Sequence, residues 1–555
     1  MRVNVIFKGK GYIQIIRKNL PMFIIVLLMI VFGFFLMFDL GRIPGLYIDE
    51  TNYMNEVISK VSFGTDIHGL RHPIYFASVW GQGQSVLYAW IVAPFIKLFG
   101  FSIYLFRAPM AILSILTILG IIFSIYFSSK DKFLAVCVAV SLVTTPWLFI
   151  SSRWVLDANI SPIFVMLGLV FMYESMIRSS KRSRYIWLVF SAIFLALSAY
   201  GYVASWMYLP FLVVALIIAS ILKKWFSIQE MLIWSLIIFV IALPLVVFAY
   251  RVNIQHINKF SKFLFFDFPY LQANRVSSLI SFKGSILGNI RVNVNSGIKQ
   301  VIFGTDSLPQ NSVAPYGAIF PFMLVFTFIG LLARKSFFND NMRNFHTIVL
   351  ISLFSFVPGM LVIKPNYNHW NFLWLPLAIL TGYGLYLSFQ RINKISWSIF
   401  LAVPVVIFWF FIFNFYFGFN NQENRFNNSN GSIAETQVID HEMTKNYKHN
   451  KLYIESLPET FNIFRLSKKP ISDSQYLLME NKAMRSSGSI VPAPSTSYGY
   501  LRDVENVSHA SKGDLAMIYE DDLNNQGYRI SNSHEWHVIA NSEFNHRKVK
   551  IFQKE

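Results

Sequence analysis

The chain has 555 residues, of which 54% are apolar, 17% aromatic and only 14% charged, a composition outside the range of soluble domains that indicates an integral membrane protein. The net charge of +19 does not indicate nucleic-acid binding, because the basic residues lie between hydrophobic runs and not on one soluble face. A single cysteine, Cys137, excludes an intramolecular disulfide and a multi-cysteine metal site.

Hydrophobic runs, taken in chain order, predict about eleven transmembrane helices. Such runs carry about 18 or more residues without a charge, enough to cross a hydrocarbon layer of ~30 Å. The first run, 20–38, is expected to be retained, because it is too long for a signal peptide and lacks a small-residue cleavage site. The predicted spans are 20–38, 102–127, 132–150, 158–177, 185–200, 205–222, 230–249, 314–333, 345–363, 371–389 and 395–417.

A twelfth run, 85–99, is predicted to lie along the membrane surface. If it crossed, the basic cluster Arg178, Lys181, Arg182 and Arg184 would face outward, against the positive-inside rule. With 85–99 at the interface, the short cytoplasmic loops are basic throughout and the N-terminus is cytoplasmic. Two large loops, 39–101 and 250–313, the turn 364–370 and the C-terminal tail are then expected outside the cell membrane.

The tail, 418–555, differs from the rest in composition. It begins with an Asn-rich linker, Asn420–Asn430, and continues with short alternating segments that predict strands, Lys451–Glu455, Leu515–Glu520 and Lys548–Gln553. The expected fold class is therefore mainly α: a polytopic helical bundle with interfacial helices over 1–417, carrying the catalytic groups, followed by a small extracytoplasmic α/β domain over 418–555.

Two adjacent carboxylates, Asp49 and Glu50, follow the first span and precede Tyr53. One interpretation is a helix cap at Asp49 before an amphipathic surface helix. The rest of this loop favours a functional site, because it forms a polar, glycine-rich stretch beside the bilayer. Its members are Gly64-Thr65-Asp66, His68, Arg71-His72-Pro73 and Gly81-Gln82-Gly83-Gln84.

Further polar groups lie at the outward ends of later spans. Arg153 and Asp157 are four residues apart, which fits either a structural ion pair or a site, because ionisable groups at membrane depth are costly. Tyr200 and Tyr202 fit an aromatic belt better than sugar stacking. The turn with Lys364, Asn366 and His369 concentrates donors that would hold a phosphate, or would be snorkelling anchors.

Several familiar catalytic motifs are absent from the sequence. It has no GxxxxGK[ST], no HExxH, no GxSxG and no Cys/His metal spacing. ATP-driven transport, zinc proteolysis and serine hydrolysis therefore lose support.

Taken in order, these features resemble the GT-C membrane glycosyltransferases, especially the protein O-mannosyltransferase and lipid A aminoarabinose transferase relatives. The resemblance covers about residues 20 to 390. Its motifs are Asp49-Glu50 with Tyr53, Gly64-Thr65-Asp66, Gly100 with Arg107-Ala108-Pro109, Arg153 with Asp157, Ser198-Ala199-Tyr200 before Leu209-Pro210, Gly304-Thr305-Asp306, and Leu375-Pro376 with Gly382-Tyr383-Gly384.

The resemblance implies a site and a reaction. Asp49 would be the catalytic base with Glu50 beside it, while Arg153, Asp157 and the turn at His369 would surround the phosphate of the donor. His72, Tyr200 and Tyr202 complete the candidate set, and relatives often have arginine where His369 stands. The implied reaction moves a sugar from a polyprenyl-phosphate carrier to a protein, lipid or glycan acceptor at the outer membrane face, with inversion.

Two alternatives remain open from the sequence. One is a transporter or flippase of lipid-linked saccharides, for which charged residues at mid-span and paired repeats would be expected. The other is a transferase of the same architecture that moves a whole oligosaccharide. We expect no organic cofactor and no nucleic-acid partner, and the sequence leaves a need for a divalent cation open.

Overall fold

The computed structural model describes residues 2–45, 48–66, 68–77, 82–256, 259–271, 278–306, 308, 311–333, 338–390, 394–417, 451–454, 497–498, 501–520, 529–544 and 547–555. The chain divides into two compact units. The first unit comprises Met1–Leu40, Arg107–Val247 and Arg275–Gly418, and the second comprises Gly41–Phe106, Phe248–Asn274 and Phe419–Glu555. The predicted linker Asn420–Asn430 and Gly81 lie outside the described residues.

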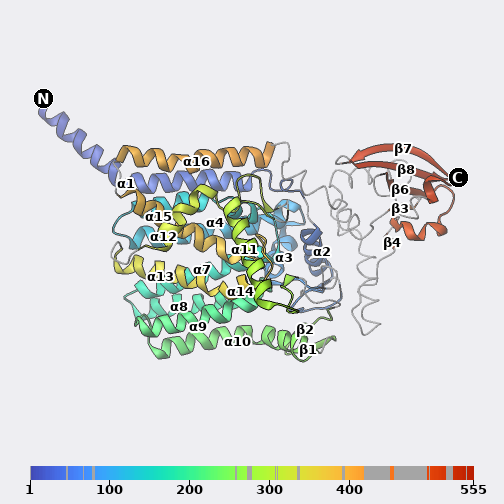
Figure 1. The fold of residues 1–555 in the computed structure, drawn as a ribbon, viewed down its shortest axis with the longest axis horizontal. Coiled ribbons are helices and arrows are strands. Elements are labelled where there is room, and N and C mark those ends of the chain that lie inside the picture. The colour runs from blue at the N-terminus through green and yellow to red at the C-terminus, as the bar shows by residue number, and fades with distance from the viewer. Residues whose placement is uncertain are drawn as a thin grey trace. The chain divides into compact units, whose positions relative to one another are not determined.

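The first unit is a helical bundle (Figure 1). Most of its helices run side by side, while α11 runs across them in the view of Figure 1. Its helices are α1 (Arg2–Met37), α4 (Ile103–Ser128), α5 (Phe133–Val143), α6 (Pro146–Ser151), α7 (Asp157–Ile177), α8 (Lys181–Ser198), α9 (Ser205–Leu222), α10 (Ile228–Asn253), α11 (Ile286–Phe303), η3 (Pro321–Met323), α12 (Leu324–Leu331), α13 (Asp340–Ser355), α14 (Val357–Val362), η5 (Asn371–Leu373), α15 (Trp374–Phe389) and α16 (Lys394–Phe417).

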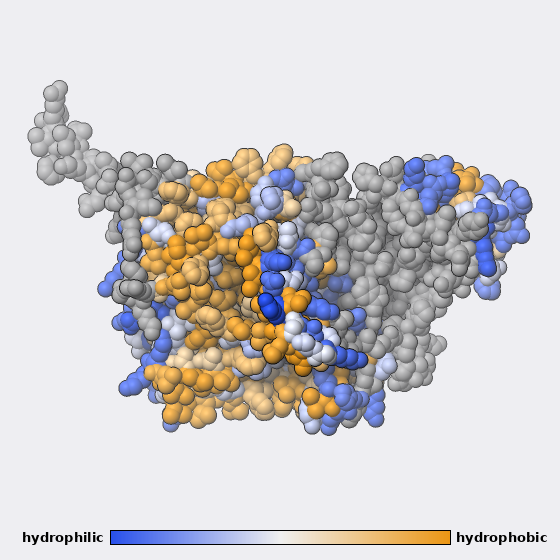
Figure 2. Space-filling view, in the orientation of Figure 1, coloured by the Kyte–Doolittle hydropathy of each residue, from blue (hydrophilic) through white to orange (hydrophobic). Residues whose placement is uncertain are grey.

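Eight stretches of helix in the described residues are long and apolar enough to cross a membrane. They correspond to eight of the eleven predicted spans, and the predicted fold class, a polytopic membrane bundle, is confirmed. Large apolar side chains remain exposed on the outer helices, as in Phe23 (64%), Leu222 (77%) and Phe413 (60%). Figure 2 shows this hydrophobic surface over the bundle, as expected for a protein whose solvent is lipid.

Three predicted spans take other forms. The run 132–150 is divided into α5 and α6, because Thr145 precedes Pro146 and adopts an extended conformation. The run 314–333 becomes helical only at Pro321, through η3 and α12. The run 185–200 corresponds to α8, which begins earlier, at Lys181, ends at Ser198 and includes cationic side chains in its first turn.

Glycines allow the closest helix contacts inside the bundle. A Cβ atom at Gly330 of α12 or Gly384 of α15 would overlap the backbone of the opposite helix, and one at Gly382 would overlap Val138 of α5. Such small residues let the backbones of membrane helices approach closely. The motif Gly382-Tyr383-Gly384 therefore has a packing role in this fold.

The second unit contains α2 (Ile48–Phe63), α3 (Leu87–Phe99) and the hairpin β1 (Ser261–Phe263) with β2 (Phe266–Phe268). Helices α2 and α3 pack against each other. With 13 residues, α3 is about 20 Å long at 1.5 Å per residue. That length is too short to cross the bilayer, which agrees with the predicted interfacial position of 85–99.

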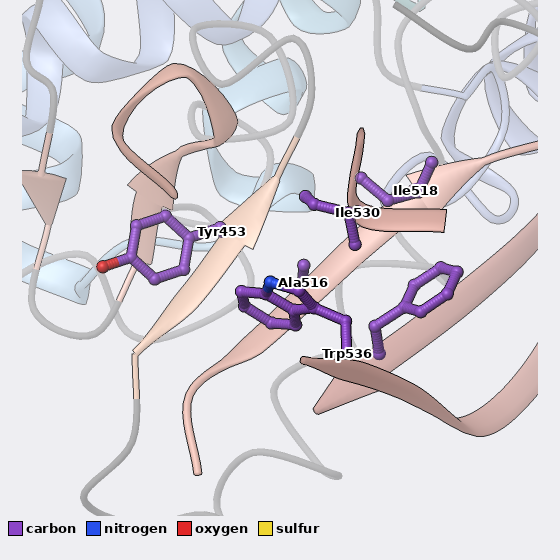
Figure 3. Close-up of a cluster of buried hydrophobic side chains, with 6 residues drawn as sticks. Tyr453, Ala516, Ile518, Ile530 and Trp536 are labelled. Carbon is purple, nitrogen blue, oxygen red and sulfur yellow. The ribbon is translucent and has the colours of Figure 1, made fainter. Parts of the chain in front are cut away.

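The tail contributes a six-stranded sheet with the order β4-β5-β3-β6-β8-β7. Strand β3 pairs in parallel with β5 and β6, whereas the other pairs are antiparallel. A small hydrophobic core includes Tyr453, Ala516, Ile518, Ile530 and Trp536 (Figure 3). The three predicted strands are confirmed as β3 (Leu452–Ile454), β6 (Leu515–Tyr519) and β8 (Arg547–Lys554); the others are β4 (Ser497–Tyr498), β5 (Leu501–Asp503) and β7 (Trp536–Phe544).

Candidate active site

Asp49 and Glu50 lie in the first turn of α2. Carboxylates are favoured there, because the helix dipole presents partial positive charge at an N-terminus. Asp49 is half-buried, while Glu50 is fully buried. Asp49 is therefore the more accessible of the two carboxylates. Tyr53, one turn later, packs its ring against Phe76 and Phe106, and these contacts hold the start of α2 in place.

The glycine-rich segment of the first loop packs against the start of α2. Phe76 and Gln84 form a β-bridge with two backbone hydrogen bonds of 2.8 and 3.0 Å. Gly83 has φ +89°, and a Cβ atom there would overlap the ring of Tyr75. The turn sends the Gln84 side chain to α2, where its Nε2 donates to the backbone oxygen of Asp49 at 3.2 Å. Gln84 thus ties the glycine-rich segment to the start of α2.

Asp267 of β2 holds the segment that contains His72. Its Oδ2 accepts hydrogen bonds from the backbone N–H groups of Arg71 and His72, both at 3.0 Å. Its backbone also bonds to His72 and Ile74, at 2.8 and 3.0 Å. The side chains of Arg71 and His72 remain exposed. The two long loops predicted on the outer side therefore meet at Asp267.

Asp66 and His68, which precede this segment in the chain, are buried. Asp66 Oδ1 accepts from the backbone N–H groups of His68 and Leu70, at 3.0 and 2.7 Å. Burial raises the pKa of the Asp66 carboxyl well above its ordinary value, and the nearby Glu56 carboxyl raises it further. Burial also lowers the pKa of His68 to about 3, so this imidazole is neutral at physiological pH. The carboxylate of the motif Gly64-Thr65-Asp66 thus stabilises the conformation of this loop through hydrogen bonds to its backbone.

In the first unit, Arg153 is fully buried in the turn between α6 and α7. Its Nη1 donates to the carbonyl oxygens of Phe35 and Leu36, at 2.6 and 2.7 Å, and its Nη2 to that of Phe38 at 2.8 Å. These carbonyls belong to the end of α1, where a helix has unsatisfied acceptors and partial negative charge. The Tyr416 hydroxyl donates to two of the same oxygens, those of Phe35 and Phe38. Arg153 therefore anchors the end of α1, the helix that precedes the first long loop.

The turn at 364–371 is built from asparagines and joined to the end of the second long loop. Asp306 Oδ2 accepts from the backbone N–H of Tyr367 at 3.1 Å and from Asn311 Nδ2 at 2.7 Å. Asn368 Nδ2 donates to Asn311 Oδ1 at 3.0 Å. The Gly304-Thr305-Asp306 motif is therefore more than a turn, because its carboxylate orders the predicted donor-phosphate segment.

Within that segment the candidate side chains differ in exposure. Asn366 is nearly buried, and its Oδ1 accepts from the backbone N–H of His369 at 2.6 Å. His369 is half-buried with its Nδ1 2.8 Å from the Lys364 carbonyl oxygen. Lys364 is exposed. The turn thus presents one exposed ammonium and one half-buried imidazole on a rigid backbone.

Asn371 connects this turn with the start of α7. Its Nδ2 donates to the Ala158 oxygen at 2.8 Å, and its Oδ1 accepts from Trp147 Nε1 at 2.7 Å. A cavity of about 20 Å³, room for one water, lies beside it between α4, α6, α7 and α15. The cavity lining includes the polar side chains Ser114, Thr117, Ser151, Ser152, Asn159 and Asn371.

The remaining candidates of the first unit are all buried. Asp157 is the first residue of α7, next to the Ala158 carbonyl that Asn371 contacts. Tyr200 donates from its hydroxyl to the Ile241 oxygen of α10 at 2.7 Å, which is a packing role. Tyr202 is 4% exposed. The structure thus brings Asp157 and the 364–371 turn together through Asn371, while Tyr200 turns toward α10.

Asp267 was missed in the sequence, whereas Asp306 was quoted there only as part of the motif Gly304-Thr305-Asp306. Asp267 accepts from Arg71 and His72 and Asp306 from Tyr367, partners that lie far away in the chain, so no local pattern predicts these contacts. The signal in the sequence that could have identified Asp267 is its position between two phenylalanines, because a carboxylate buried among apolar side chains requires hydrogen-bond partners.

Comparison with known proteins adds one finding. No protein-family model and no curated protein matches the sequence. The structure resembles ArnT from Cupriavidus metallidurans in its apo state, with a TM-score of 0.55 and 12% identity over 95% of this chain and 97% of that one. The chain has the ArnT fold. The same values hold for ArnT bound to undecaprenyl phosphate.

Other similar structures are more distant. The oligosaccharyltransferase of Archaeoglobus fulgidus gives a TM-score of 0.48 at 11% identity, over 81% of this chain and 64% of that one. The S. cerevisiae Pmt1-Pmt2 complex gives 0.31 at 14%, over 47% and 38%. The GT-C resemblance predicted from the sequence is confirmed at the level of the fold by the ArnT match alone.

The described residues contain no group of three or more His, Cys, Asp or Glu side chains arranged to hold a metal ion. Chemically, the second unit offers an accessible carboxylate on a fixed helix end. The first unit offers an exposed ammonium at Lys364 and amide donors at Asn368 and Asn371. These are groups suited to proton abstraction and to phosphate binding, respectively.

Proposed function

We propose that this protein is a membrane glycosyltransferase that takes a sugar from a polyprenyl-phosphate carrier. The observation that carries the proposal is Asp49, a half-buried carboxylate in the first turn of a helix that follows the first span of an ArnT fold. ArnT itself has been crystallised with undecaprenyl phosphate, a carrier of this chemical class. The acceptor would be a hydroxyl of a protein, lipid or glycan at the outer membrane face.

In the proposed reaction, an acceptor oxygen attacks the anomeric carbon of the donor sugar. The new carbon–oxygen bond forms as the bond to the phosphate oxygen breaks, so the phosphate leaves with the electron pair. The acceptor proton moves to the Asp49 carboxylate. This single displacement inverts the anomeric carbon, and general-base help of this kind is typically worth about 10² to 10⁴ in rate.

The donor phosphate would be held by the segment around Lys364 and His369, with Asn366 fixing its backbone. A phosphate that loses water at the membrane surface needs charge-assisted donors, and Lys364 supplies an exposed ammonium. Arg153, Asp157 and His72 belong to the same proposal as groups that position or contact the donor. We propose no cofactor for this chemistry.

The test is the change Asp49→Asn in the purified full chain, reconstituted in lipid vesicles with a panel of polyprenyl-phosphate sugars. Asparagine keeps the size of the side chain but cannot accept the proton, so sugar release should fall by roughly 10² or more while donor binding persists. Glu50→Gln is the matched control, because Glu50 is adjacent but fully buried, and it should cost less.

The opposite result is equally clear. If Asp49 only stabilises the start of α2, Asn serves about as well at a helix N-terminus and Asp49→Asn would be nearly silent. Full activity in that variant would refute the assignment. Saccharide transport across the vesicle membrane without sugar release would instead identify a transporter.

A further inference from the structure

Two buried asparagines connect the turn at 364–371 with the carboxylate of Asp306. Asp306 Oδ2 accepts hydrogen bonds from Asn311 Nδ2 at 2.7 Å and from the backbone N–H of Tyr367 at 3.1 Å. Asn311 is fully buried, and its Oδ1 accepts from Asn368 Nδ2 at 3.0 Å. Asn368 is only 7% exposed. The three side chains therefore form one hydrogen-bonded series that runs from a carboxylate through two amides.

The carboxylate determines the direction of each hydrogen bond in this series. Asp306 Oδ2 accepts from two donors, and a carboxylate oxygen without a proton can only accept. Asn311 must therefore present its NH2 group to Asp306, which leaves its carbonyl oxygen for Asn368. An amide oxygen also only accepts, so Asn368 must present its NH2 group to Asn311. Turning either amide over would place two acceptor oxygens against each other.

The orientation of Asn368 leaves its own carbonyl oxygen buried and unpaired. Among the residues that the structure describes, Asn368 Oδ1 has no hydrogen-bond partner. A buried acceptor without a donor costs free energy, and nearly all such groups in folded proteins have a partner. The amide cannot turn to relieve this cost, because its NH2 group is held by Asn311. Asn368 Oδ1 therefore requires a hydrogen-bond donor that the described residues do not supply.

The proposed substrate has three parts, of which only the sugar can donate a hydrogen bond. The polyprenyl chain has no polar hydrogen. The phosphate between chain and sugar is a diester with one negative charge and no proton, so its oxygens only accept and would be repelled by Asn368 Oδ1. Each sugar hydroxyl, in contrast, is a donor. The sugar is bonded directly to the phosphate, for which Lys364 and His369 of the same turn are the proposed contacts.

We propose that Asn368 Oδ1 binds a hydroxyl group of the transferred sugar, and that Asp306 and Asn311 are positioning residues that keep this oxygen turned toward it. The inference rests on the proposed function, because it takes the sugar from a polyprenyl-phosphate carrier. It gives the turn two tasks: Lys364 and His369 balance the charge of the phosphate, while Asn368 recognises the sugar. A buried oxygen that can only accept discriminates against any sugar that lacks a hydroxyl at the matching ring position.

The experiment compares a hydroxyl with a fluorine on the sugar. Polyprenyl-phosphate mannose, glucose and arabinose are prepared with each hydroxyl replaced in turn by fluorine, which is similar in size but cannot donate a hydrogen bond. Affinities are measured for the purified full chain in lipid nanodiscs, without an acceptor, so a hydroxyl of the acceptor cannot contribute. For at least one sugar, one fluorine should weaken binding to the wild type by about tenfold. In Asn368→Leu, the same fluorine should have little effect.

Two further variants control for folding. Asn293→Leu is the matched control, because Asn293 is also a buried amide, 5% exposed, but its Nδ2 donates to the carbonyl oxygens of Met360 and Ile363, ahead of the turn. This variant should keep the loss of about tenfold on fluorination. Asn311→Leu keeps Asn368 but removes the amide that fixes its direction. The loss on fluorination should therefore become smaller in Asn311→Leu, which gives a second test should Asn368→Leu not fold.

The outcomes separate this proposal from the proposed function. A fluorine effect that persists in Asn368→Leu would overturn the sugar contact, and so would a wild type that no fluorine weakens, in which case Asn368 Oδ1 binds water only. The reference ligand is the methyl diester of polyprenyl phosphate, which has the charge of the sugar carrier but no hydroxyl. If this diester binds as tightly as every sugar carrier, the sugar contact alone is refuted. If no carrier binds at all, the proposed function is refuted together with the contact.

Discussion

The carboxylate of Asp267 accepts a hydrogen bond of 3.0 Å from the backbone N–H of His72, although 195 residues separate them in the chain. The same oxygen accepts from Arg71 N–H at 3.0 Å, and Asp267 is only 5% exposed. A buried carboxylate that receives two backbone donors fixes a loop more rigidly than exposed side-chain contacts do. Asp267 is thus a positioning residue for the segment that carries His72.

We expect Asp267→Ala to lower turnover by roughly 10- to 100-fold, because a displacement of about 1 Å in a site residue has effects of this size. The loss should appear in sugar release from folded, reconstituted protein, with donor affinity measured in parallel. Lys262→Gln is the matched control. Lys262 is exposed and 3.4 Å from the same carboxylate, so removing it leaves the two backbone hydrogen bonds intact. Wild-type turnover in Asp267→Ala would show that the loop keeps its position without the carboxylate.

The pH dependence of stability should report on Asp66. Burial raises the pKa of this carboxyl above its ordinary value of 3.8, so the folded protein keeps a proton that the unfolded chain has released. Above that ordinary value the unfolded state therefore binds fewer protons than the native state, and the free energy of unfolding falls as pH rises. Melting temperatures of the purified protein should accordingly decrease from pH 5 toward pH 8.

Asp66→Asn should remove much of this dependence. Its Oδ1 can still accept from the backbone N–H groups of His68 and Leu70, and it carries no titratable proton. Asp340→Asn, at an exposed side chain, controls for general charge effects. An unchanged pH profile in Asp66→Asn would assign the titration to another group, with Glu56 the next to test.

The orientation of the chain can be tested with two exposed positions. In a Cys137→Ser background, Ser180→Cys lies at the start of α8 among the basic residues, and Thr305→Cys lies after α11. An impermeant thiol reagent added to intact cells should label Thr305→Cys and leave Ser180→Cys unlabelled until the cells are opened. The reverse pattern would invert the proposed topology and place Asp49 on the cytoplasmic side.

The parts of the fold that were predictable depend on patterns local in sequence. Uninterrupted apolar runs identified the spanning helices, and basic residues between them singled out 85–99, which forms the short helix α3. Alternating residues in the tail gave β3, β6 and β8. Failures occurred where one residue changed the local conformation, as at Thr145 before Pro146, which divides a predicted span.

The site was less predictable, because its contacts join distant segments. The spacing of Arg153 and Asp157 suggested neighbours on one helix face, but Arg153 lies in the turn before α7, so the i, i+4 rule does not apply. Three of its hydrogen bonds go to the carbonyl oxygens of Phe35, Leu36 and Phe38. Likewise, Asn311 and Asp306 gain their role only when the second long loop folds onto the turn at 364–371.

Arg153 has two separable roles to test, the anchor of α1 seen in the structure and the proposed contact with the donor phosphate. Arg153→Ala takes its donor away from the buried Leu36 oxygen, while Tyr416 can still donate to the oxygens of Phe35 and Phe38, so the change should cost on the order of 1–3 kcal/mol and lower the melting temperature. Arg153→Lys keeps the charge but loses the planar fork that reaches all three oxygens, so it should also destabilise the fold. Tyr416→Phe is the matched control, because it removes the one hydroxyl that contacts two of the same oxygens and does not change the charge.

Donor affinity separates the two roles of Arg153. A phosphate contact depends chiefly on positive charge, so Arg153→Ala should weaken binding of a polyprenyl phosphate by about tenfold, as expected for loss of one charge-assisted interaction. Arg153→Lys should keep most of that affinity, and Tyr416→Phe should keep all of it. If instead all three variants bind the lipid phosphate as the wild type does, once corrected for the folded fraction, Arg153 acts only on α1. The phosphate site would then lie with Lys364 and His369, where the exposed ammonium and the half-buried imidazole remain to be changed in turn.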